Sequence, residues 1–214
     1  MGKIFAGPWA NFQGKVGNVV GRISQGRTVL SVYQPIVRNP KTTPQLKARQ
    51  KFSLATSALS PITGFLRYGF HFLDGYKTGN PFSAAVGYNL SHGAIAGAYP
   101  NQEFDYSKAK VAEGSLDLPY SPSCTADGTT LSITWADNSG LGNAEATDKV
   151  MICVLNAEKG QSVYNIELAD RNERNATLTC PTAWSGDTVN VWLAMRREST
   201  NECSMSTHLG AMPL

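Results

Sequence analysis

The last ninety or so residues hold a series of short apolar runs separated by turn residues, and this pattern restricts the fold more than any other feature. The runs cover residues 130–135, 149–155, 163–168, 176–180, 187–195 and 202–209. About seven short strands over such a length are typical of an antiparallel β-sandwich. We therefore expect a sandwich over residues 116–214. Its core should contain the apolar residues that alternate along these runs, among them Leu131, Ile133, Trp135, Val150, Ile152, Val189, Val191 and Leu193.

A helix is expected to begin at Thr43, which can cap it, with Pro44 at the first helical position. The apolar residues that follow recur at spacings of four, three and four, which predicts one buried stripe made of Ala48, Phe52, Ala55 and Leu59. Two more helices are expected at 62–72 and 81–95, the second capped by Asn80, and one strand at 104–111. Residues 43–115 thus form a helical region with one strand.

The first 42 residues are expected to form a glycine-rich, basic β arm. Residues 16–23 and 28–33 carry β-branched side chains and flank a turn at Gly26, which is typical of a β-hairpin. Glycines such as Gly17 and Gly21 are too frequent for ordinary strands and indicate bulges or the close approach of another backbone. The whole chain is therefore predicted to be α+β. We expect the arm to be ordered by contacts between molecules rather than by a core of its own.

Charge is distributed very unevenly. No Asp or Glu precedes Asp74, and ten Lys and Arg residues lie in that stretch, whereas the remaining 141 residues carry 9 bases and 16 acids. Such asymmetry favours either a nucleic-acid contact or association between copies of the chain. The sequence has neither the apolar core of a signal peptide nor a run long enough to span a bilayer. We expect synthesis in the cytoplasm without a signal peptide, and no membrane insertion.

No motif for catalysis, a metal or a cofactor is recognisable. The chain lacks a G-x-S-x-G elbow and a phosphate-binding loop, and its histidines His71, His92 and His208 are far apart. The four cysteines form no C-x-x-C pair, so a zinc site is not indicated. Four acidic residues in the sandwich loops match no calcium-binding loop, namely Glu158, Glu167, Asp170 and Glu173. We predict a non-enzymatic protein without cofactors.

One segment has the spacing N-P-x-T-x-x-Q-x-x-x-R-x-x-F, formed by Asn39, Pro40, Thr42, Gln45, Arg49 and Phe52. It follows a glycine-rich strand pair and resembles the opening of small phage-associated proteins of unknown function and of uncharacterised Bacteroidota-type proteins. That resemblance implies a component of a virion or another multi-copy assembly. The C-terminal part, with Leu131–Trp135 and a later Gly186–Leu193 run, resembles an immunoglobulin-like or fibronectin type III-like sandwich, which implies a binding or spacer module.

Our first functional hypothesis is a structural subunit of a phage virion, capsid- or tail-associated, that forms a homo-oligomer or joins other subunits of the same assembly. The arm and the start of the first helix would supply the contacts, through Lys15, Gly17, Gly21, Arg22, Gly26, Arg27, Arg38, Asn39, Gln45 and Arg49. One alternative is a nucleic-acid-binding protein that uses the basic N-terminal region. A second is an adhesion or carbohydrate-binding module, with Trp184 as a ligand-contacting residue in a sandwich loop.

Overall fold

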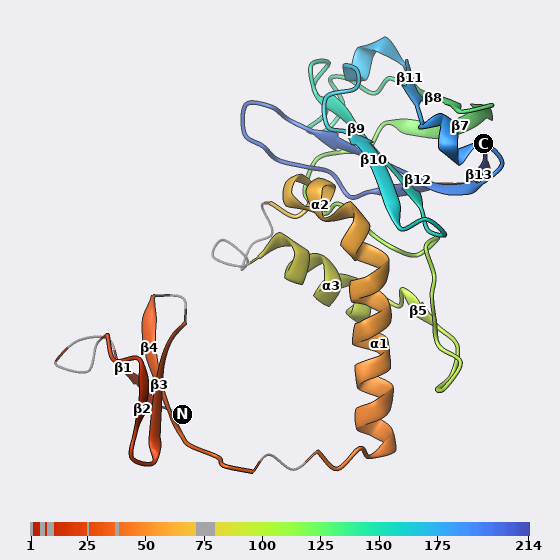
Figure 1. Cartoon of the computed structure of the whole chain (residues 1–214). Helices are drawn as coiled ribbons and strands as arrows, with labels where there is room; N and C mark the ends of the chain where they lie inside the picture. The colour runs from red at the N-terminus through yellow and green to blue at the C-terminus, as the bar shows by residue number, and fades with distance from the viewer. Residues whose placement is uncertain (1, 5–6, 8–10, 25, 37–38, 72–79) are drawn as a thin grey trace. The chain divides into compact units, whose positions relative to one another are not determined.

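The computed structural model describes residues 2–4, 7, 11–24, 26–36, 39–71 and 80–214 (Figure 1). The chain divides into two compact units, Met1–Thr42 and Thr43–Leu214. Helices and antiparallel sheets are both present and the C-terminal part is rich in strands, so the coarse prediction of an α+β protein is confirmed. Among the described residues, no helix is long and apolar enough to cross a membrane.

The N-terminal unit is a four-stranded antiparallel sheet. Its strands are β1 (Gly2–Ile4), β2 (Gly14–Val16), β3 (Val19–Ser24) and β4 (Arg27–Val32), arranged in the order β1-β4-β3-β2. The predicted hairpin is β3–β4. The described residues form two clusters of buried apolar side chains, and both clusters lie in the second unit. Among the residues of this sheet whose burial is described, only Gly21, Thr28 and Val29 are buried.

The second unit begins with helices α1 (Thr43–Leu59), α2 (Thr63–Gly69) and α3 (Pro81–Ser91), with the short turn η1 (Ser60–Ile62) after α1. Asn80 caps α3 as expected, because its Oδ1 accepts a hydrogen bond of 3.0 Å from the Phe82 amide. Two core predictions are wrong: Ala48 is exposed, and Phe52 is 56% exposed. The buried stripe of α1 is confined to its last turns, at Ala55, Ala58 and Leu59, and the earlier turns extend beyond α3 (Figure 1).

The strand expected at 104–111 is much shorter. Only β6 (Glu103–Phe104) forms, and it pairs with β5 (Ile95–Ala96). Asp105 ends it, because the carboxylate accepts hydrogen bonds from both the amide and the hydroxyl of Ser107. A local turn of this kind competes with a strand ladder for the backbone.

Two sheets form the predicted sandwich, in the orders β10-β9-β12-β13 and β11-β8-β7. The strands are β7 (Tyr120–Asp127), β8 (Thr130–Ala136), β9 (Lys149–Asn156), β10 (Gln161–Asn165), β11 (Asn175–Thr179), β12 (Thr188–Arg196) and β13 (Thr207–Pro213), with the short turns η2 (Arg171–Glu173) and η3 (Thr182–Trp184). All the predicted core residues are buried between the sheets. The last strand starts at Thr207 rather than at 202. The sequence does not predict β7, because the residues of that strand are mostly exposed and polar.

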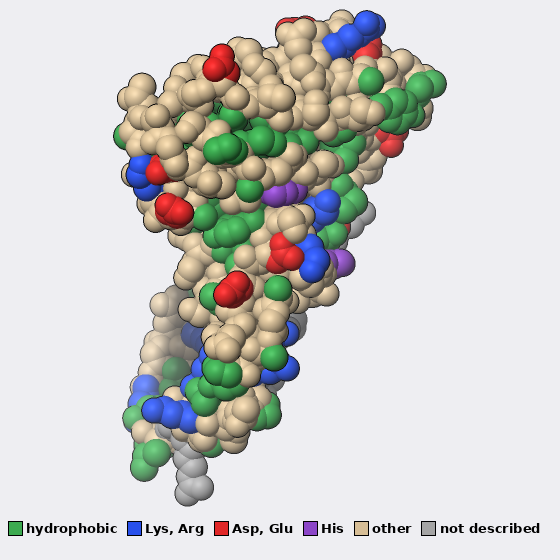
Figure 2. Space-filling view, turned by 90° about the vertical axis from the view of Figure 1, so that its right-hand side faces the viewer, with side chains coloured by type: hydrophobic (Ala, Val, Ile, Leu, Met, Phe, Trp, Pro, Cys, Tyr) green, Lys and Arg blue, Asp and Glu red, His purple; other side chains and the backbone are tan. Residues whose placement is uncertain are grey.

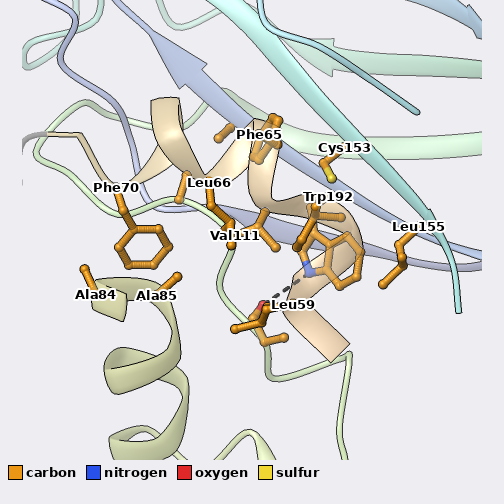
Figure 3. Packing of buried hydrophobic residues seen from close by; sticks show 14 of the residues in the cluster. Leu59, Phe65, Leu66, Phe70, Ala84, Ala85, Val111, Cys153, Leu155 and Trp192 are labelled. Carbon is orange, nitrogen blue, oxygen red and sulfur yellow. Dashed lines mark hydrogen bonds between the residues drawn. The ribbon is translucent and has the colours of Figure 1, made fainter. Parts of the chain in front are cut away.

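The helices of the second unit cover the outer face of the sandwich sheet β10-β9-β12-β13 (Figure 3). Alternate residues of β9 and β12 point away from the sandwich interior and join a second cluster with the helices, which includes Met151, Cys153, Leu155, Trp192 and Ala194 together with Leu59, Phe65 and Leu66. The Trp192 indole donates a 3.2 Å hydrogen bond to the Ala109 carbonyl. The boundary that we placed at 115/116 therefore falls inside one compact unit with a shared core.

Candidate interaction surface

One face of the N-terminal sheet carries four exposed apolar side chains, although Phe12 lies over Gly21 and Thr28 is buried on that face. Residues that pair across antiparallel strands share a face, and successive residues alternate between faces. The register aligns Val16 with Val19 and Val19 with Val32. Ile23 lies four residues after Val19 on the same strand and therefore on the same side. We call Val16, Val19, Ile23 and Val32 the apolar face. These four side chains are between 39% and 67% exposed.

The opposite face is basic. Lys15 pairs with Val20, Arg22 lies two residues further along β3, and Arg27 on β4 pairs with Ser24, so all three share this side. Tyr33 lies with them, because the Lys15 Nζ is 3.4 Å from the centre of its ring. We call Lys15, Arg22, Arg27 and Tyr33 the basic face, and all four side chains are exposed. The sheet thus has its exposed cations on one side and its most exposed apolar side chains on the other, although Val20 and the buried Val29 also lie on the basic side.

The glycines singled out in the sequence form tight loops and a close contact within the N-terminal sheet. Gly17 has φ +57 and Gly26 has φ +70, and each lies in a two-residue loop, between Val16 and Val19 and between Ser24 and Arg27 respectively. Such tight loops need a residue that tolerates positive φ. A side chain at Gly21 would collide with the ring and carbonyl of Phe12. The close approach that we expected between molecules at Gly21 is therefore a contact within the arm.

The remaining predicted contact residues lie near the boundary between the units. Arg38 is outside the described residues. Asn39 is exposed, and Gln45 and Arg49 are exposed one turn apart on α1. Phe52 follows at the next helical position on that side, so these three α1 residues form a surface stripe rather than a core contact.

Trp184 is not a ligand-contacting loop residue, and that expectation is wrong. Its side chain is 1% exposed and belongs to the sandwich core. The indole Nε1 donates a 3.1 Å hydrogen bond to the Gln161 side chain. An indole that is buried with its polar atom satisfied is a packing residue.

A charged cleft of about 550 Å³ lies on the second unit, lined by Glu145, Thr147, Lys149, Asp170, Arg197, Glu198 and Ser199. Its charges largely satisfy one another. Lys149 pairs with Asp170 at 2.5 Å, and the Nε of Arg197 is 2.9 Å from the buried carboxylate of Asp148. That carboxylate is also 3.0 Å from the fully buried guanidinium of Arg171. The network explains the local structure without a ligand.

Two kinds of reactive group can be assessed in the described part of the chain, metal-ligating clusters and cysteine thiols. No group of three His, Cys, Asp or Glu side chains there could hold a metal ion. Burial raises the pKa of Cys124 to about 11 and that of Cys203 to about 12, and it also raises the pKa of Cys153 and Cys180. These thiols are therefore protonated at neutral pH and are poor nucleophiles.

Comparison with known proteins places the chain in a family. No curated protein matches the sequence. Residues 11–210 match a family of unknown function, DUF6266, so the match includes most of the N-terminal sheet and nearly all of the second unit. The chain belongs to the DUF6266 family.

Proposed function

We propose that this chain is a non-enzymatic structural subunit of a multi-copy assembly, and that it associates through the apolar face of its N-terminal sheet. The observation that carries the proposal is the exposure of Val16, Val19, Ile23 and Val32 on one side of a sheet. A sheet with one apolar face is stable when another layer buries that face. The setting that the sequence resemblance implies is a phage virion, capsid- or tail-associated.

The occupant that we propose for the apolar face is the same face of a second copy. Two such sheets can stack about 10 Å apart as a two-layer sandwich. A contact of this kind is isologous, so one surface serves both partners. It also directs the two basic faces away from each other, which keeps like charges apart. The small size of the sheet makes each contact weak, and many copies would be needed for a stable assembly.

Within this proposal, the C-terminal sandwich is an immunoglobulin-like or fibronectin type III-like spacer. Its strand order supports that assignment: the first, second and fifth strands form one sheet, and the third, fourth, sixth and seventh form the other. Domains of this class keep the third, sixth and seventh strands together opposite the first, second and fifth. The class supports many functions, so the sandwich alone indicates no ligand.

Sedimentation of the full chain over a range of concentrations tests the proposal. The variant V16T/V32T keeps the β-branched shape but places two hydroxyls in the contact, and each hydroxyl buried without a partner costs about 1–3 kcal/mol. We expect the unchanged protein to grow in size with concentration and the variant to stay monomeric. The control L141T alters an equally exposed apolar residue, at 55%, in the second unit.

Two results would count against the proposal. A chain that is monomeric at every concentration overturns it. In that case, a variant V16T/V32T that is more expanded in X-ray scattering would show that the chain's own second unit covers the apolar face. Equal loss of association in L141T would also overturn it, because the contact would then not depend on the N-terminal sheet.

A further inference from the structure

We infer that the basic face binds the phosphate backbone of nucleic acid. Its three cations come from three neighbouring strands, with Lys15 on β2, Arg22 on β3 and Arg27 on β4. The register places them on the side opposite the apolar face. Nucleic-acid binding can therefore occur while the apolar face is occupied, and the inference does not require self-association.

The three cations form a row that runs diagonally across the sheet. Each step from one cation to the next crosses one strand and advances two residues. Strand spacing and rise put these Cα positions about 8 Å apart. Cations that converge on one point would suit a small anion, whereas a row over three strands suits an extended polyanion. The exposed Tyr33 beside Lys15 adds an aromatic surface of the kind that supports base stacking.

The charge of the unit supports the same partner. Residues 1–42 contain six Lys and Arg and no Asp or Glu, so the formal charge of the unit is strongly positive. Lys and Arg that neutralise phosphates release counterions from the nucleic acid, which supplies sequence-independent affinity. Recognition of a particular base sequence is not implied.

The competing partner for the basic face is the acidic second unit of another copy. That unit carries 16 acids and 13 bases, and many of its acids are already paired. Asp187 pairs with Lys159, Glu167 with Arg196 and Glu145 with Arg197. Figure 2 shows acidic and basic side chains close together on the sandwich, with no large patch of one sign on the face drawn. A uniform row of cations fits a uniform row of phosphates better.

Salt dependence of binding by the full chain tests the inference. The probes are a fluorescent 20-base-pair DNA duplex and a 20-nucleotide oligothymidylate, followed by anisotropy between 50 and 200 mM NaCl. Three phosphate contacts on the duplex predict that affinity falls about 40-fold over this range. In R22Q/R27Q one contact is left, and the fall should shrink to about 3- to 4-fold. The charge-preserving variant R22K/R27K should retain the steep dependence.

The matched control K108Q/R174Q removes two exposed cations from the second unit, where the side chains are 61% and 68% exposed. The DNA affinity of this control should still fall about 40-fold between 50 and 200 mM NaCl, and so should that of V16T/V32T. The inference is overturned if neither probe binds at 50 mM NaCl, or if the control loses as much as R22Q/R27Q. It is also overturned if R22Q/R27Q binds DNA normally but associates less, which would identify the acidic unit of a second copy as the partner.

Discussion

Truncation of Trp192 to alanine should destabilise the helices and the sandwich together. The side chain is 1% exposed and lies in the cluster that joins β9 and β12 to the helices. Removing a buried Trp typically costs about 3–5 kcal/mol. The Ala109 carbonyl would also lose the indole that donates to it, which adds to the loss. For a unit of this size, about 4 kcal/mol corresponds to a fall in Tm of roughly 8–16 °C.

Urea unfolding of the full chain measures this effect, with circular dichroism at 222 nm for the helices and fluorescence of the remaining tryptophans for the sandwich. We expect both signals to shift to lower urea by the same amount. The control Trp135→Ala removes a residue buried between the two sheets and should shift the same single transition. Two separate transitions, with Trp192→Ala affecting only the helical one, would refute the shared core. The sandwich would then be an independent domain from about residue 116.

Two further predictions concern buried polar groups in the second unit. Asp148→Asn should lower the free energy of unfolding by about 3–5 kcal/mol, because it leaves the fully buried Arg171 guanidinium without its carboxylate; D148N/R171M should recover much of the loss in the same urea assay. Burial lowers the pKa of His208 below 6.5, so the unfolded chain takes up this proton first as pH falls. The contribution of His208 to stability is therefore present above pH 6.5 and is lost as pH falls through its folded pKa. In thermal melts, His208→Gln should flatten the dependence of Tm on pH over this range. An unchanged dependence would contradict the lowered pKa of His208.

The strands of the sandwich were predictable where one face is buried and the other is not. Leu131, Ile133 and Trp135 alternate with polar residues, and the period alone identifies β8. In contrast, β9 reads Val150–Leu155 without a polar residue. A continuous apolar run indicates burial on both faces. That signal predicts a second layer on the outer face of the sheet β10-β9-β12-β13, where the helices lie.

Other residues could not be placed from the sequence because their environment is set by distant parts of the chain. Trp184 lies between turn residues, which is typical of an exposed loop, yet the neighbouring strands bury it. Phe52 has the spacing of a core residue, but it is exposed, and the buried residues of α1 begin at Ala55. Local pattern determines which residues could face a core, and tertiary packing determines which of them do.

The two faces of the N-terminal sheet depend on register, and register depends on the turns. A shift of one residue in the pairing would move every side chain of a strand to the opposite side. The loops at Gly17 and Gly26 contain two residues each, and they pair Val16 with Val19 and Ser24 with Arg27. Tight loops of fixed length leave little freedom for such a shift. The glycines that first indicated an intermolecular contact therefore act indirectly, by keeping the valines on one face and the cations on the other.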